Sequence, residues 1–213
     1  MGRSCTIRPR PCPPRDGTML KQFLIACLLG LALAGPAGAA SVLPLLLDEI
    51  IDTAAVAFQG TCIGNRTERE TQTNRVVTYT TFAVTDVLKG TVQATHVIKQ
   101  IGGKMPAGEL SYRVDGVPTF AVGEDYVVLL AGVSAAGFSS PIGLAQGKFT
   151  VQQDASGQRV SNGRDFREMM AGMPAVVLPQ VTAKLLGEAT APVRHLGLDE
   201  FKQLVRARAG RVQ

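Results

Sequence analysis

Short apolar, β-branched and aromatic runs, in places alternating with polar residues, recur between residues 54 and 161 and predict β-strands. Polar and glycine-containing stretches between the runs predict turns. Strands are expected at 54–63, 75–88, 95–101, 109–114, 125–131, 142–152 and 158–161. The run 125–131 (DYVVLLA) is continuously apolar, so we expect both of its faces to be covered. The polar run 66–74 is interpreted as the first hairpin loop.

The same alternation predicts which strand side chains face the core. Phe82, Val84 and Leu88 are expected to share one face of their strand. Phe149 and Val151 are expected to point inward from a later strand, with their neighbours pointing the other way. A glycine inside the first strand, at position 60, indicates a bulge or a bend.

Two helices are predicted to flank the strands. Residues 44–53 (PLLLDEIIDT) carry apolar side chains at helical spacing. Residues 197–210 form the second helix, with Asp199 as its N-cap and an apolar face. That face contains Phe201, Leu204 and Val205.

The fold class expected from these elements is mainly β. Short, regularly spaced strands with glycine-rich turns favour a small antiparallel barrel, with a short N-terminal helix and a C-terminal helix. We assign the barrel domain to 42–165 and the C-terminal helix to 197–210. Residues 166–196 are rich in Pro, Ala and Gly and are interpreted as a linker.

Residues 19–39 (MLKQFLIACLLGLALAGPAGA) have the organisation of a secretory signal peptide. Lys21 precedes an apolar run, and Ala37-Gly38-Ala39 forms a cleavage site of small residues. We therefore expect a secreted or periplasmic protein that begins near residue 40. Alternatives are an uncleaved anchor or a lipoprotein with lipidated Cys27. Residues 1–18 are interpreted as a doubtful or disordered extension, with translation starting at Met19.

Charge and cysteine content change once residues 1–40 are removed. The chain holds 22 Lys+Arg and 17 Asp+Glu, but five of those cations and one anion precede residue 41, which leaves a net charge of +1. This balance gives no support for nucleic-acid binding. Cys62 is then the one remaining cysteine, so no internal disulfide is expected. It is interpreted as a buried strand residue or as one half of an intermolecular disulfide.

A search for catalytic and metal-binding motifs supports neither chemistry. His96 and His195 are far apart in sequence, and no HExxH, paired CxxC, calcium loop or Gly-x-Ser-x-Gly motif is present. We therefore expect no metal, no cofactor and no enzymatic activity. The alternative is a hydrolase that uses Cys62 and His96, with Asp86 as a third member.

Two glycine-containing segments are candidates for binding. Gly102-Gly103 ends a strand, and Gln146, Gly147 and Lys148 lie within another predicted strand. Small residues allow a partner's backbone to approach, which predicts a binding edge. The alternative is that these glycines are structural and allow the barrel to close.

The order of five short segments resembles a group of exported bacterial β-barrel proteins of unassigned function. The segments are FQG at 58–60, VTDVLKG at 84–90, IGG at 101–103, GEDYVVLL at 123–130 and QGKF at 146–149. This resemblance covers about residues 48–152. The strand pattern is in turn similar to the netrin-like fold of tissue inhibitors of metalloproteinases, an OB-type barrel. Those inhibitors place an N-terminal cysteine on the protease zinc, and this chain lacks that cysteine, so their mechanism does not carry over.

These observations lead to a functional expectation. The protein is expected to be an exported, non-catalytic β-barrel module that binds a ligand or an exported protein partner, with no membrane association after signal cleavage. Two alternatives stay open: an inhibitor or accessory factor of an exported protease, and the hydrolase built on Cys62 and His96.

Overall fold

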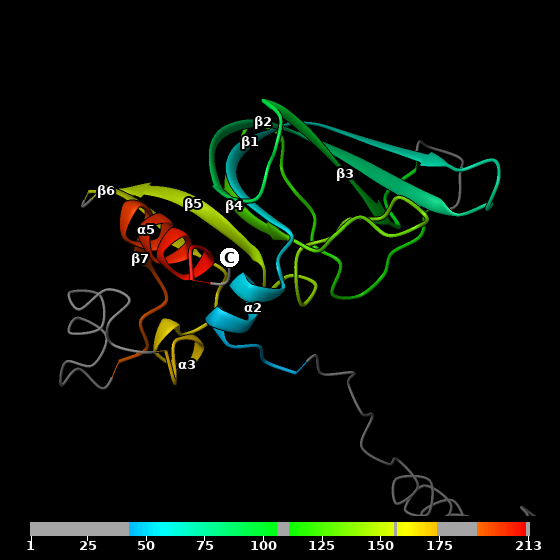
Figure 1. Ribbon diagram of the computed structural model, residues 1–213. Coiled ribbons are helices and arrows are strands. Elements are labelled where there is room, and N and C mark those ends of the chain that lie inside the picture. Colours follow the sequence, from blue (N-terminus) through cyan, green and yellow to red (C-terminus); the bar gives the residue numbers. More distant parts are fainter. Residues whose placement is uncertain (1–42, 106–110, 156, 174–190, 212–213) are drawn as a thin grey trace, which may run out of the picture. The chain divides into compact units, whose positions relative to one another are not determined.

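The computed structural model describes residues 43–105, 111–155, 157–173 and 191–211 (Figure 1). The segments 1–18 and 19–39 discussed above lie outside these residues, as does 174–190 of the expected linker. In chain order the elements are α2 (Leu47–Thr53), β1 (Val56–Arg69), β2 (Val76–Lys89), β3 (Thr95–Ile101), β4 (Asp125–Leu130), β5 (Lys148–Asp154), β6 (Gly157–Ser161), α3 (Phe166–Met169), β7 (Leu196–Gly197) and α5 (Leu198–Ala209).

The strands form one antiparallel sheet in the order β3-β2-β1-β4-β5-β6-β7. The mainly β class, with an opening helix and a C-terminal helix, is confirmed. In the described part of the chain β3 and β7 remain edges, so the sheet is open rather than a closed barrel. Figure 1 shows β1 and β2 bending strongly along their length. Three register shifts between these strands provide the bend, because each bulge adds local twist.

The first hairpin extends further than its polarity predicts. The expected loop at 66–74 is wrong in its first half, because β1 continues to Arg69 and pairs with β2 as far as the Arg69–Val76 position. The turn is confined to 70–75. The polar residues at the end of β1 are therefore strand residues.

Helices α2, α3 and α5 cover part of one sheet face and form the helix-backed core. The rings of Phe149 and Phe201 lie 4.5 Å apart, and Phe166 lies 6.1 Å from each of them. Arg208 on α5 donates two hydrogen bonds to Asp52 on α2, at 2.8 and 2.5 Å. The Arg208 hydrogen bond lowers the pKa of Asp52, although burial opposes this shift. Helices α2 and α5 are thereby joined directly.

A second apolar cluster fills the opposite, concave side of the bent strands and is called the cavity-side core. Its members are Phe58, Cys62, Phe82, Ile98, Phe120, Tyr126, Val128 and Leu130. Strand β4 serves both cores, since Val127 and Leu129 pack in the helix-backed core and the alternate residues in this one. The expectation that both faces of β4 are covered is confirmed.

A bulge in β2 changes which of its residues face each core. Gln59 pairs with Asp86 but Gly60 pairs with Val84, so Thr85 is the extra residue. Val84 consequently packs against the cavity-side core, whereas Leu88 belongs to the helix-backed core. The expectation that Phe82, Val84 and Leu88 share one face is wrong, because one inserted residue reverses the alternation.

The C-terminal part contains more structure than a linker. Phe166–Met169 forms α3 within the expected linker, and its Phe166 and Met169 are fully buried. Gly197, rather than Asp199, is the N-cap residue of α5. The strand expected at 109–114 is seen only as one bridge between Gly103 and Tyr112, with 109–110 outside the described residues. No helix in the described part is long and apolar enough to cross a membrane.

Candidate functional site

Polar side chains replace apolar ones along the concave face of the bent strands. Phe82 on β2 and Ile98 on β3 belong to the cavity-side core. Thr80 lies two residues from Phe82 on the same face of β2, and Gln100 lies two residues from Ile98 on the same face of β3. The exchange continues across the β1–β2 pair, where Asn65 lies opposite Thr80 and Thr67 opposite Thr78. Thr80 and Gln100 are buried, Thr67 and Thr78 are part-buried and Asn65 is exposed, in positions that continue the inward-facing rows of core side chains.

Hydrogen bonds between neighbouring strands order this polar surface. Thr80 Oγ1 donates to Asn65 Oδ1 at 2.7 Å, and Asn65 Nδ2 donates to the Phe120 carbonyl at 2.7 Å. Thr78 Oγ1 donates to the Gly102 carbonyl at 2.7 Å, so the 2.9 Å contact between Thr67 and Thr78 is donated by Thr67. The hydroxyl hydrogens of all three threonines are thus committed within the protein, and only oxygen lone pairs remain available.

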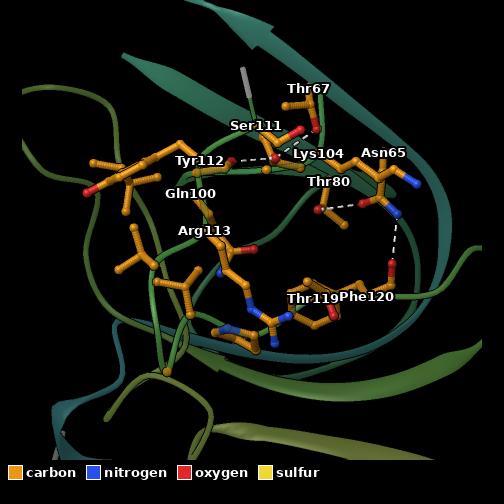
Figure 2. A pocket seen from close by; sticks show the side chains of 18 of the residues that line it. Asn65, Thr67, Thr80, Gln100, Lys104, Ser111, Tyr112, Arg113, Thr119 and Phe120 are labelled. Atoms are coloured by element: carbon orange, nitrogen blue, oxygen red, sulfur yellow. Dashed lines mark hydrogen bonds between the residues drawn. The ribbon is translucent and has the colours of Figure 1, made fainter. Parts of the chain in front are cut away.

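A cavity of about 660 Å³ lies against this surface (Figure 2). The strands β1, β2 and β3 provide one wall. The loop 111–120, which we call the roof loop, provides the other through all of its residues except Asp115. Its lining residues are Asn65, Thr67, Thr78, Thr80, Gln100, Ile101, Gly102, Gly103, Lys104, Ser111, Tyr112, Arg113, Val114, Gly116, Val117, Pro118, Thr119, Phe120 and Ala145. The volume falls in the range typical of small-molecule sites.

Gln100 is the least satisfied polar group of the cavity wall. The residue is 3% exposed, and its Nε2 has no hydrogen-bond partner among the described residues. A buried donor without a partner costs about 1–3 kcal/mol, so such groups are uncommon in folded proteins. Because Nε2 itself has almost no accessible surface, a ligand acceptor or an ordered water in the cavity would satisfy it after a small rotation of the side chain.

The charge of the cavity lining is of one sign. Among the residues that the structure describes, Lys104 and Arg113 are the charged residues of the lining, and none of the lining residues is an aspartate or glutamate. Apolar side chains accompany them, including Val117 and the ring of Phe120. Figure 2 shows the Gln100 and Arg113 side chains in the space between the strand threonines and Phe120.

The structure places Gly102 and Gly103, two of the expected binding residues, in the cavity wall. Their backbones are already paired: Gly102 N–H donates to the Val76 carbonyl, and Gly103 exchanges two hydrogen bonds with Tyr112. A Cβ on Gly103, which has φ +147°, would lie 2.1 Å from Thr78 Oγ1. The close approach expected at this Gly-Gly pair is therefore made by the protein's own roof loop.

Gln146 and Gly147, two further expected binding residues, lie outside the cavity lining and make structural contacts. Gln146 Oε1 accepts hydrogen bonds from Leu45 N at 2.8 Å and from Arg164 Nη1 at 2.6 Å. A Cβ on Gly147 would lie 2.7 Å from the Leu129 carbonyl oxygen, so this glycine permits strand packing.

Lys148, the last expected binding residue, connects β5 to the roof loop. Its Nζ donates to the Thr119 carbonyl at 2.5 Å and lies 5.0 and 4.9 Å from the ring centres of Phe120 and Tyr126. Burial lowers the pKa of this amine. Lys148 lines a second hollow of about 420 Å³, together with residues that include His195.

The residues of the hydrolase alternative are not brought together. The register places Phe82 between Cys62 and His96, and Asp86 lies on the α5 side in an ion pair with Lys202. Cys62 is fully buried, and burial raises the pKa of its thiol. The His96 ring packs edge-on against Phe58 at 5.2 Å, and burial lowers the pKa of this histidine.

Sequence reasoning missed the strand residues that form the cavity wall. Thr78 and Thr80 follow the inward-facing phase of Phe82, which was a usable signal, but the polar end of β1 was interpreted as a loop. Comparisons with protein-family models, curated proteins and solved structures gave no match.

Proposed function

We propose that the protein is an exported, non-catalytic binding module whose site is the cavity between β1–β3 and the roof loop. One observation carries the proposal. Gln100 lines a cavity large enough for a small molecule and is 3% exposed, and its Nε2 donor has no hydrogen-bond partner among the described residues. Evolution tolerates such a cost at sites where a ligand provides the missing partner.

Binding rather than catalysis is supported by the chemistry of the lining. The cavity contains hydroxyl, amide and cationic groups, but neither Cys62 nor a histidine lines it. A small ligand is also favoured over a strand-like partner at Gly102-Gly103, because the backbone groups of both glycines are occupied. Export remains a prediction from the signal-like segment at 19–39.

The experiment is a thermal-shift screen of the chain from residue 41 onward against a defined library of carboxylates, sugars, amino acids and nucleotides. At least one class should raise the melting temperature, and mass spectrometry should recover that compound chemically unchanged. Ser111→Trp, which places a large ring at the cavity lining, should abolish the shift, whereas Thr71→Trp, at an exposed turn position outside the lining, should preserve it.

Two results would contradict the proposal. One is a screen in which no compound produces a shift sensitive to Ser111→Trp. The other is conversion of a compound that is lost in Cys62→Ser while the variant remains folded, which would favour the hydrolase instead.

A further inference from the structure

The direction of hydrogen-bond donation in the cavity carries information about its ligand. Gln100 Nε2 is an unused donor, and Ser111 Oγ accepts from Met105 N at 2.9 Å, which leaves the Ser111 hydroxyl hydrogen available. Lys104 and Arg113 add groups that only donate. The unused polar groups away from the threonines are thus predominantly donors, and they call for a ligand rich in acceptors.

The charge of the cavity lining narrows the class of ligand further. Both charged residues of the described lining are cations and none of its described residues is a carboxylate, so a negative ligand meets complementary charge there. A planar carboxylate suits Arg113, because a guanidinium can donate two parallel hydrogen bonds to it. The threonine side offers oxygen lone pairs, which repel a carboxylate and direct it toward Gln100 and Arg113.

The rest of the cavity wall is suited to an apolar body. Ile101, Val114, Val117 and Phe120 line it, and Phe120 is 5% exposed. Figure 2 shows Arg113 and Phe120 within the same space, so a head group and an apolar body can be held together. We infer that the cavity binds an amphipathic organic carboxylate, with the carboxylate at Gln100 and Arg113 and the apolar part against the roof loop. This inference rests on the proposed function and gives it a ligand class.

The test compares ligands that share a tail and differ in the head group. Isothermal titration calorimetry is performed on the chain from residue 41 onward with octanoate, 1-octanol and octylamine. Octanoate should bind with a stoichiometry of one and at least about tenfold more tightly than the other two, as expected for a charge-assisted hydrogen bond. A hydrophobic tripeptide with a free or an amidated C terminus distinguishes a peptide end from a fatty carboxylate as the source of the head group.

Matched variants locate the binding site. Gln100→Leu and Arg113→Met should each weaken octanoate binding by about tenfold or more, and Arg113→Met should also reduce its dependence on salt. Gln153→Leu and Arg75→Met remove an amide and a cation at exposed positions outside the cavity, and should leave the affinity unchanged.

The outcomes separate the two proposals. If octanol or octylamine binds as tightly as octanoate, in a manner sensitive to Ser111→Trp, the carboxylate class is wrong and the binding module stands. If octanoate binds but Gln100→Leu and Arg113→Met have no effect, the assignment of the head group is overturned. If no head group binds and the library screen is also negative, both proposals fail.

Discussion

The two faces of the sheet are covered by different kinds of structure. Helices α2, α3 and α5 fill one side with apolar side chains, and three phenylalanine rings pack together there. On the other side, a loop without regular helix or strand covers bent strands, and a cavity of about 660 Å³ remains beside a smaller apolar cluster. Close packing gives the first side its stability, whereas the second leaves space and an unpaired amide.

This comparison suggests a division of labour that single substitutions can test. Changes in the helix-backed core should reduce stability and leave the binding site intact while the protein stays folded. Changes at the cavity should affect stability less, and in one case should improve it.

Phe149→Ala should produce the largest loss, about 3–5 kcal/mol of unfolding free energy, because the fully buried ring contacts two other phenylalanines. Lys148→Ala, the adjacent change on the opposite strand face, should cost less, since it removes one hydrogen bond and ring contacts at the roof loop. Urea denaturation measures both. A nearly neutral Phe149→Ala would mean that the register of β5 is displaced by one residue.

Gly103→Ala should cost about 1–3 kcal/mol or more, since its Cβ would lie 2.1 Å from Thr78 Oγ1 in a backbone conformation of φ +147°. Gly64→Ala on β1 is the control, because nothing lies within 4 Å of its added Cβ. Melting temperatures of the two variants should differ clearly. If they are equal, the close contact between Gly103 and the threonine pair does not exist in solution.

Two glutamines provide the sharpest contrast between the regions. Gln146→Leu should cost about 1–3 kcal/mol, because Leu45 N and the Arg164 guanidinium lose their shared acceptor. Gln100→Leu should instead stabilise the unliganded protein by about 1 kcal/mol, since it removes a buried donor that has no partner among the described residues. Denaturant melts without ligand test the signs. A destabilising Gln100→Leu would show that the amide is already satisfied.

The smallest effect concerns pH. Burial lowers the pKa of His96 below its ordinary value near 6.5, so the unfolded chain binds the proton more readily than the folded one. The contribution of His96 to stability should therefore decrease as the pH falls below about 6.5. His96→Gln should remove this part of the dependence. Identical stability profiles between pH 7.5 and 5 for the two proteins would show that His96 is solvated.

Local sequence signals predicted the regular elements well where a turn residue limits them. Strand β3 ends at Ile101 because Gly102-Gly103 follows, and its predicted and observed bounds agree. Helix α5 follows the spacing of Phe201, Leu204 and Val205, all fully buried. In these cases a few neighbouring residues are sufficient to predict the position of the element.

Other features depend on contacts that no local pattern contains. The bulge at Thr85 occurs in a run of β-branched residues without a glycine to mark it. The end of β1 is polar because it faces a cavity, and polarity alone is also typical of a loop. For the candidate site, Gly102 and Gly103 were identified from their turn chemistry. Gln100 was missed, since its importance comes from burial without a partner.

The ion pair between Asp52 and Arg208 joins positions 156 residues apart, and this separation constrains the order of folding. Strands β1 to β4, which carry the cavity-side core, are all complete by residue 130, whereas the opposite face needs α5 at 198–209. In a chain that emerges N terminus first, the pairing of β1 to β4 can precede that covering step. Until α5 has been synthesised, the apolar face around Phe149 remains accessible to chaperones. Chains stalled before and after α5 should therefore differ in protease resistance mainly at that face.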